Sequence, residues 1–360
     1  MDQAALKQEI SNSFGSPSVV IDLDKVEANI AKLQGQCEAA GVANRPHVKT
    51  HKSPELAKMQ VDAGASGITC QKLGEAEVMV DGGLDNILIS YNLLGQEKME
   101  RLAALSKRAN IAVVADNPVV VEALAGAGAM AGQPINVLVE CDTGQKRAGV
   151  ETAGEAVTLA KQIGASAGLS FKGLMFYPPV DGWPVTQGFF DEAKAGLAAA
   201  GLTAQIVSTG GTPNLVNLGQ LEGATEHRSG TSIFNDRMMM ACGAATLEDC
   251  ALQVYATVVS RAGPERGILD SGSKTLTSDP GGLDGFGYIL EYPDARIKGF
   301  SEEHGFLDLS SSGPKPEVGE IVRVVPNHVC VVVNMVDRLV TVRGGEIVGE
   351  LPVAARGRIS

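Results

Sequence analysis

The sequence lacks the features that mark several large classes of protein. Aromatic side chains make up only 4% of the 360 residues, and the six cysteines are scattered without a CxxC pair. Such cysteine usage argues against a disulfide framework and favours a reducing cytoplasm. No apolar run approaches the ~20 residues of a membrane span, and the first fourteen residues lack the apolar segment of a signal peptide. We therefore expect a cytoplasmic protein that does not enter membranes.

Positive charge is also scarce. The chain carries 42 acidic and 30 basic residues, for a net charge of −12, and it has no run rich in Lys or Arg. This balance argues against nucleic acid and anionic membranes as partners, although a local basic pocket could still bind an anion. No GxGxxG opens a helix after the first apolar run, which disfavours a dinucleotide-binding fold. An acidic enzyme with a small-molecule substrate fits best.

What the chain does contain is a repeated alternation of short apolar runs and helical patterns. Hydrophobic residues make up 44%, enough for one large α/β domain and a smaller one. The alternation predicts βα units, and about eight units predict a (β/α)8 barrel. The apolar runs are residues 18–21, 46–48, 67–70, 86–90, 111–115, 135–140, 170–176, 204–207 and 225–228.

The pattern of apolar runs and helical segments changes after about residue 245. Apolar runs there alternate with turns and include no long amphipathic helix, which predicts an all-β domain; they are residues 253–261, 319–325, 328–336, 338–343 and 346–353. We expect residues 1–23 to pack on this β domain, residues 24–245 to form the barrel and residues 246–360 to form the β domain. The Gly-rich segment 281–294 is expected to be a loop.

Polar residues recur where the predicted barrel strands end. In a barrel of this class, functional side chains follow the carboxyl ends of the strands. Six groups of residues in these places predict a single binding site at one end of the barrel. The first group is His47, Lys49 and His51, and the other five are Gln71, Asp142–Arg147, Tyr177, Ser208–Thr212 and Arg228–Thr231.

Lys49 stands between two histidines, His47 and His51. Burial and neighbouring cations lower the pKa of a lysine and free its amine to attack a carbonyl. A solvated surface lysine is equally compatible with this spacing. The turns Ser208–Thr212 and Ser229–Thr231 offer backbone N–H groups and small hydroxyls, which is how loops hold a phosphate. One such turn is common in barrels, and two at consecutive strand ends are more specific.

His328 and Cys330 alternate on a predicted strand, which places both side chains on one face. Imidazole and thiolate suit Zn²⁺, and only two protein ligands would leave positions for water or substrate. A core cysteine beside a hydrogen-bonded histidine is the alternative. His304 has acidic neighbours and is a further candidate for proton transfer, although an exposed loop histidine fits equally well.

These segments resemble the D-threonine aldolase and D-serine dehydratase group of fold-type III pyridoxal-phosphate enzymes, which are related to alanine racemase. The resemblance covers most of the chain and is carried by residues 18–24, 45–52, 70–77, 230–236, 301–305 and 326–330. It implies an alanine-racemase-like barrel followed by a β domain, an active site between them, and a homodimer.

The resemblance also assigns roles to residues. It implies that Lys49 holds pyridoxal phosphate as a Schiff base and that Arg228 faces the pyridine nitrogen, leaving that nitrogen unprotonated and the ring a weaker electron sink. Gln71, Arg147 and Tyr177 would line the cofactor. The phosphate would be held by Ser208, Thr209, Gly211, Gly230 and Thr231.

His328 and Cys330 match the divalent-metal ligands of the group, for Zn, Mn or Mg. A metal on the β-hydroxyl of a D-amino acid would assist either retro-aldol cleavage to glycine and an aldehyde or β-elimination to a keto acid and ammonia. His47 or His304 would carry the proton. The His-x-Cys pair is similar to that of zinc-dependent dehydratases, whereas the chain as a whole is similar to bacterial D-threonine aldolases.

We therefore expect D-threonine aldolase-like activity, with dehydration of D-serine or D-threo-3-hydroxyaspartate as the alternative. Ser232 and Phe234 stand where relatives often carry tyrosine, so we expect the substrate contacts to differ from theirs. Three other functions remain open. A non-catalytic pyridoxal-phosphate carrier would not need the β domain or the metal pair. An amino-acid racemase would not depend on metal, and a Schiff-base aldolase would lack the cofactor.

Overall fold

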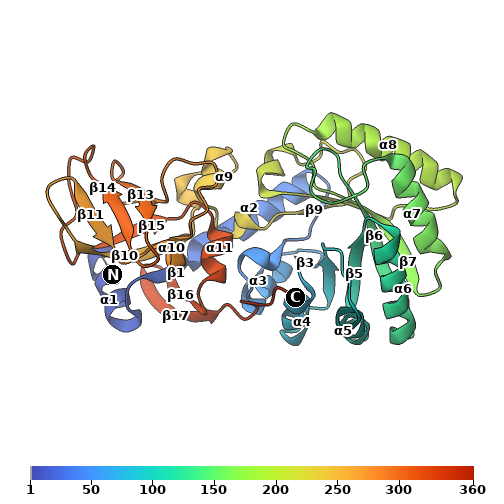
Figure 1. The fold of residues 1–360 in the computed structure, drawn as a ribbon, viewed down its shortest axis with the longest axis horizontal. Coiled ribbons are helices and arrows are strands. Elements are labelled where there is room, and N and C mark those ends of the chain that lie inside the picture. Colours follow the sequence, from blue (N-terminus) through green and yellow to red (C-terminus); the bar gives the residue numbers. More distant parts are fainter. Residues whose placement is uncertain (1) are drawn as a thin grey trace. The chain divides into compact units, whose positions relative to one another are not determined.

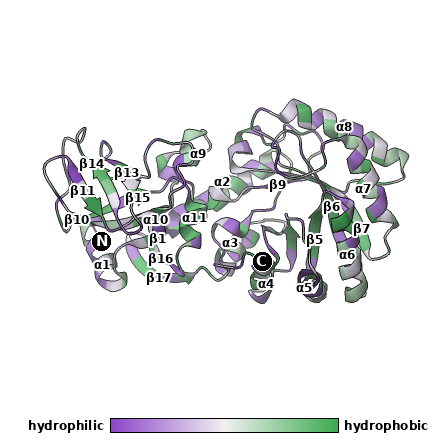
Figure 2. Ribbon diagram, viewed as in Figure 1, coloured by the Kyte–Doolittle hydropathy of each residue, from purple (hydrophilic) through white to green (hydrophobic). Residues whose placement is uncertain are grey.

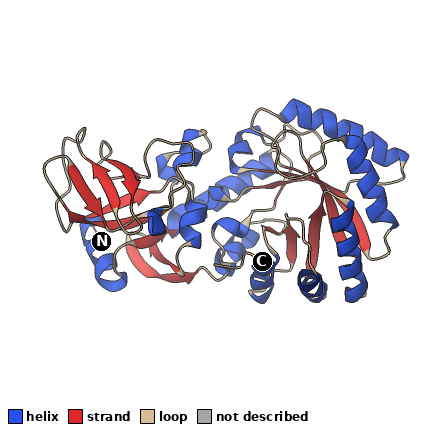
Figure 3. Ribbon diagram, viewed as in Figure 1, coloured by secondary structure: helices blue, strands red, loops and turns tan. Residues whose placement is uncertain are grey.

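A computed structural model describes residues 2–360. Their contacts form two compact units, each with its own sheet (Figure 3). Unit 1 contains the residues up to Ala31, Thr50–Ser53 and Thr231–Arg356; unit 2 contains Lys32–Lys49, Pro54–Gly230 and Gly357–Ser360. No helix among the described residues is long and apolar enough to cross a membrane.

Unit 2 is a barrel of eight parallel strands in the order β2-β9-β8-β7-β6-β5-β4-β3. A bridge between His47 and Thr69 continues the pairing from the β2 segment to β3. The predicted (β/α)8 barrel is therefore confirmed. The strands are β2 (Ala43–Asn44), β3 (Ile68–Cys70), β4 (Asn86–Ile89), β5 (Asn110–Ala115), β6 (Ile135–Cys141), β7 (Leu169–Phe176), β8 (Ile206–Gly210) and β9 (Glu226–Arg228).

The helices between the strands begin where side chains cap their first N–H groups. Asn117 Oδ1 accepts the Val120 N–H at 3.0 Å at the start of α6, and Thr152 with Glu155 forms a capping box before α7. Figure 1 shows these helices on the outside of the strands, and Figure 2 shows the strands as mainly hydrophobic. The helices are α3 (Pro54–Asp62), α4 (Leu73–Asp81), α5 (Gln96–Ser106), α6 (Pro118–Ala131), α7 (Ala153–Ala165) and α8 (Trp183–Ala199).

The interior of the barrel is divided between apolar and charged side chains. Leu88, Val114, Leu138 and Met175 form a buried cluster contributed by β4 to β7. The β2 segment, β8 and β9 instead bury polar side chains, which are Arg45, Ser208, Glu226 and Arg228. Barrel interiors are usually filled by branched apolar residues, so this charged sector is a departure that bears on the site.

Unit 1 is built around a mixed sheet. One of its inner strands, β1 (Ser18–Asp22), pairs antiparallel with β10 and parallel with β16. Leu6 and Ile10 of α1 (Gln3–Phe14) pack on the sheet beside Tyr255 and Val340. The other strands are β10 (Leu252–Ser260), β11 (Arg266–Leu269), β12 (Tyr288–Ile289), β13 (Arg296–Phe300), β14 (Gly305–Asp308), β15 (Ile321–Val325), β16 (Arg338–Arg343) and β17 (Glu346–Pro352); α9 is Arg237–Ala241 and α10 is Ser273–Leu276. The helix α2 (Leu23–Ala39) belongs to unit 1 up to Ala31 and to unit 2 from Lys32.

Two predicted strands are wrong in detail. Residues 328–336 form the short helix α11 (Val329–Asn334) instead of a strand, because the buried Asp236 carboxylate accepts the Val329 N–H at 3.1 Å and starts a helical turn. This tertiary contact overrides the β propensity of the valines. The run 46–48 follows β2 but is not a regular strand, since Val48–Thr50 is a 3₁₀ turn. The predicted loop 281–294 contains the two-residue strand β12.

The bulge in β7 generates a prediction. Gly173 has φ +153°, and a Cβ there would lie 1.8 Å from the Ile206 carbonyl oxygen on β8. Gly173→Ala should therefore lower the free energy of unfolding by about 2–4 kcal/mol. Gly188 in α8 has open space around it, so Gly188→Ala should instead raise stability by about 0.5–1 kcal/mol. Denaturant titration checks both, and equal effects would contradict the close approach of β7 and β8.

Candidate functional site

Lys49 lies on the 3₁₀ turn that follows β2, and its side chain is half-buried. Its backbone N–H points at His47 Nδ1, 3.4 Å away. His47 Nε2 lies 3.1 Å from Gln71 Oε1 and 3.3 Å from Ser90 Oγ. Burial, followed by the charge of Lys49, holds the pKa of His47 well below its usual value. The histidine beside Lys49 is therefore a neutral imidazole with both ring nitrogens engaged.

The loops after β8 and β9 are joined to each other. Thr212 Oγ1 is 2.8 Å from Ser229 Oγ, and the Gly211 N–H donates to the Arg228 carbonyl at 2.8 Å. Gly211 has φ +107°, and a Cβ there would lie 3.3 Å from the Tyr177 hydroxyl. Glycine is required because the backbone is left-handed. The result is bare backbone between two strand ends, which suits a phosphate group.

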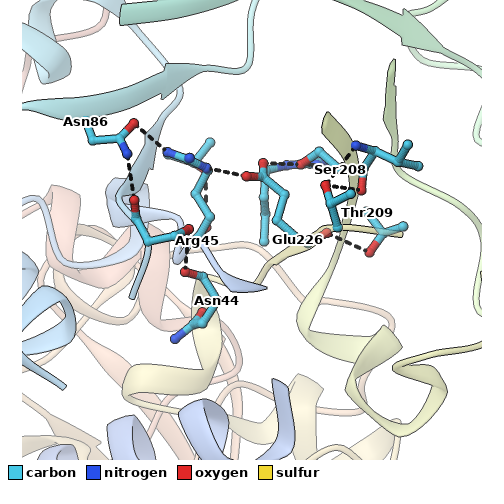
Figure 4. Close-up of polar contacts among 11 residues, drawn as sticks. Asn44, Arg45, Asn86, Ser208, Thr209 and Glu226 are labelled. Atoms are coloured by element: carbon cyan, nitrogen blue, oxygen red, sulfur yellow. Dashed lines mark hydrogen bonds and ion pairs between the residues drawn. The ribbon is translucent and has the colours of Figure 1, made fainter. Parts of the chain in front are cut away.

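Ser208 and Thr209 have partners inside the barrel wall (Figure 4). Ser208 Oγ donates to Glu226 Oε1 at 2.7 Å and accepts from Arg228 Nη1 at 2.5 Å. Thr209 Oγ1 lies 3.0 Å from His227 Nδ1. Both side chains are buried, so the hydroxyls of this predicted pair are held by protein groups. Their contact with a phosphate stays a prediction.

Arg147 and Tyr177 come together above a buried carboxyl. The Arg147 guanidinium carbon is 4.8 Å from the Tyr177 ring centre, and its Nη2 is 3.9 Å from Glu140 Oε1. Burial raises the pKa of Glu140 to about 7, against the lowering effect of Arg147 and Arg228. Glu140 is not among the residues predicted from the sequence, where its one signal is a charge at the end of the apolar run 135–140.

His328 and Cys330 lie at the start of α11 in unit 1. His328 is the N-cap residue and Cys330 is in the first turn. Asp236 is fully buried, and its Oδ2 is 3.0 Å from His328 Nδ1. Burial lowers the pKa of His328, but Asp236 and Cys330 outweigh it and raise that pKa to about 10. Because Asp236 engages Nδ1, Nε2 is the ring nitrogen that could bind a metal.

Two threonines lie next to the thiol of this pair. Thr50 Oγ1 is 3.1 Å and Thr231 Oγ1 is 3.9 Å from Cys330 Sγ. Within residues 2–360, no three His, Cys, Asp or Glu side chains are grouped in a way that could hold a metal ion. A metal at His328 and Cys330 would therefore need ligands from water or substrate, as catalytic zinc sites do.

The remaining candidates lie elsewhere in the two units. His304 is exposed in the turn between β13 and β14, where its carbonyl accepts the Ser301 N–H at 2.9 Å. His51 is fully buried, and its Nδ1 accepts the Ser53 N–H at 3.1 Å. Gly230 directly follows Ser229 at the end of β9. None of these contacts by itself defines a role in catalysis.

Comparison with known proteins places this geometry in context. Residues 21–238 match the alanine racemase N-terminal domain family, and residues 251–342 match the putative serine dehydratase domain family. A D-threonine aldolase of Arthrobacter sp. is 34% identical over 95% of this chain and 93% of its own. The D-threo-3-hydroxyaspartate dehydratase of Delftia sp. is 31% identical over 90% of this chain and 93% of its own. The crystal structure of the D-threonine aldolase from Filomicrobium marinum superposes with a TM-score of 0.89, at 32% identity over 96% of both chains.

The raised pKa of Glu140 makes stability depend on pH. The folded protein binds this proton more tightly than the unfolded chain does, so the contribution of Glu140 to stability falls as pH rises from about 4.5 to about 7. In the cofactor-free protein, Glu140→Gln should therefore gain stability relative to the wild type between pH 5 and pH 8, by up to about 3 kcal/mol.

Urea unfolding at the two pH values measures this difference. Glu192→Gln is the matched control. Glu192 is exposed on α8, so this substitution removes the same charge from a carboxyl that is not buried. A stability difference between Glu140→Gln and wild type that stays constant with pH would contradict the buried, proton-binding state of Glu140.

Proposed function

The chain belongs to the D-threonine aldolase and D-serine dehydratase family of fold-type III pyridoxal-phosphate enzymes, and from this we propose that it is a lyase acting on β-hydroxy D-amino acids. The observation that carries the proposal is the set of groups that follow the carboxyl ends of the barrel strands β2, β7, β8 and β9. A lysine on a turn, a bare glycine loop between two strand ends and an arginine stacked on Tyr177 are what this cofactor needs from a protein.

Pyridoxal phosphate, when bound, supplies a ring that accepts electrons from bonds at the α-carbon of an amino acid. The Lys49 amine is the group that would hold its aldehyde carbon. The backbone at Gly211, Thr212 and Gly230 would hold its phosphate, since side chains are absent or small there. Tyr177 and Arg147 would bound one side of the ring. His47 would remain neutral, because burial and the charge of Lys49 oppose its protonation, and its Nε2 would stay bonded to Gln71.

His328 and Cys330 would hold a divalent metal, for which the imidazole and thiol favour zinc. Such a metal supplies Lewis acidity to a substrate hydroxyl. Asp236 would orient the His328 ring and favour metal binding through Nε2, because the carboxylate keeps the Nδ1 proton in place. Thr50 would hydrogen-bond the Cys330 sulfur.

We propose retro-aldol cleavage to glycine and an aldehyde as the main reaction. The similarity to two D-threonine aldolases over nearly the whole chain supports it. Dehydration is the second candidate, because the His-x-Cys pair and the similarity to a D-threo-3-hydroxyaspartate dehydratase favour it.

The two reactions are separated by their products. The enzyme is incubated with D-threonine, D-serine or D-threo-3-hydroxyaspartate, in the presence of Zn²⁺, Mn²⁺ or a chelator. We expect glycine and an aldehyde from D-threonine, and loss of activity with the chelator. If the products are a keto acid and ammonia instead, the reaction is dehydration and the aldolase assignment is wrong. Neither pair of products from any substrate would contradict both.

Lys49 can be tested by colour as well as by rate. Lys49→Ala should lose the yellow colour of the bound cofactor and reduce turnover by roughly a thousandfold or more, because the amine that holds the cofactor is gone. Lys58→Ala, on the exposed face of α3, should keep both colour and turnover. If Lys49→Ala retains a yellow adduct that borohydride reduces, another lysine carries the cofactor.

The metal pair can be tested by elemental analysis of the protein loaded with cofactor and zinc. His328→Ala should lose bound metal while keeping the cofactor colour, since His328 is not among the residues proposed to hold the cofactor. His304→Ala changes an exposed histidine and should keep its metal. Unchanged zinc content in His328→Ala would place the metal at other ligands.

A further inference from the structure

A chain of buried polar contacts crosses the interior of the barrel in unit 2 (Figure 4). Arg45 Nε donates to Glu226 Oε2 at 2.7 Å. The other carboxylate oxygen, Oε1, accepts from Ser208 Oγ at 2.7 Å, and that hydroxyl accepts from Arg228 Nη1 at 2.5 Å. One carboxylate thus connects two guanidinium groups through a single hydroxyl, and all four side chains are at least nine-tenths buried.

Burying these charges is costly. An ion pair inside a protein contributes less stability than apolar residues of the same volume commonly would, and β4 to β7 fill their share of the same interior with apolar side chains such as Leu138. Part of the same interior is therefore filled without any charge. Local departures of this kind are expected where they serve function.

The outer end of the chain of contacts is fixed. Arg45 Nη1 donates to Asn86 Oδ1 at 3.2 Å, and Asn86 Nδ2 donates to the Ser66 carbonyl at 2.6 Å. Arg45 and Glu226 line a cavity of about 280 Å³ together with Asn110 and Asn136. Since Arg45 is held by Asn86 on β4 as well as by Glu226 on β9, the carboxylate that it pairs with has little freedom to move.

The inner end of the chain of contacts is Arg228, in the last position of β9. Its Nη2 donates to the Phe176 carbonyl at 2.9 Å, and a Cβ at Gly210 would lie 2.9 Å from the same nitrogen. Burial lowers the pKa of Arg228 to about 10, and Glu226 is the largest influence that opposes this lowering. The position of the guanidinium therefore depends on Glu226 through Ser208, and the carboxylate favours the charged form of Arg228.

We propose that Glu226 is a positioning residue for the cofactor: through Ser208 it fixes Arg228 as a charged hydrogen-bond donor to the ring nitrogen of pyridoxal phosphate. The inference rests on the proposed function. It adds that the ring nitrogen is controlled from the interior of the barrel, by a residue that touches neither cofactor nor substrate. Glu226 and Ser208 act in series, so removing either should have the same consequence.

The test measures binding of two compounds to the cofactor-free protein: pyridoxal phosphate, and its analogue in which C–H replaces the ring nitrogen. Wild-type protein should prefer pyridoxal phosphate, because only its nitrogen can accept from Arg228. Glu226→Gln should lower this preference by roughly tenfold. Ser208→Ala should lower it as much, and the double variant should be no worse than either single one.

Glu291→Gln is the matched control. Glu291 also forms a partly buried ion pair, at 2.8 Å from Arg323 in unit 1, so this variant loses a comparable carboxylate while its preference for the ring nitrogen should stay at the wild-type value. Ser208→Ala also covers the case in which Glu226→Gln does not fold, because it leaves the Arg45–Glu226 pair intact.

The outcomes separate this inference from the proposed function. Wild-type protein that binds neither compound overturns the proposed function and the inference together. Normal binding with an unchanged preference in Glu226→Gln and Ser208→Ala overturns the inference alone. Additive losses in the double variant also overturn it, as does a loss in Ser208→Ala that is equal for both compounds, which would mean that Ser208 contacts the phosphate.

Discussion

The geometry of the candidate site depends on an ion pair inside the barrel, between Arg45 Nε and Glu226 Oε2 at 2.7 Å. It fixes one wall of the interior, and the same carboxylate continues through Ser208 to Arg228 at the end of β9. The loops that follow β8 and β9 are bonded to each other at that end. The bare glycine backbone therefore stands on a rigid base, which is the condition for holding a small anionic group in one orientation.

A similar principle applies in unit 1. Asp236 is buried, accepts the first N–H of α11 and holds the His328 ring at Nδ1. One carboxylate thus ends the extended segment after β15 and orients a candidate metal ligand. In each unit, one candidate functional side chain, Arg228 or His328, is held by a buried carboxylate that would not itself touch a substrate.

The sequence was sufficient for the barrel because its periodicity is local. Apolar runs and caps such as Asn117 specify strands and helices without long-range information. It also singled out Lys49 and the two glycine-containing turns. It could not assign α11, since the valines after Cys330 favour a strand, and the helix is started by a hydrogen bond from the Val329 N–H to Asp236, 93 positions away along the chain. Nor could it identify Glu226 and Glu140, because a charged residue in an apolar run carries no sign of its partners before the strands are assembled.

We propose that Lys49 holds pyridoxal phosphate. Borohydride reduction of the protein loaded with cofactor, followed by proteolysis and mass spectrometry of the peptides, tests this assignment. We expect the mass of one reduced cofactor on the peptide that contains Lys49, and on no other lysine peptide. The same mass on a different lysine, or on none while the intact protein is yellow, would contradict it.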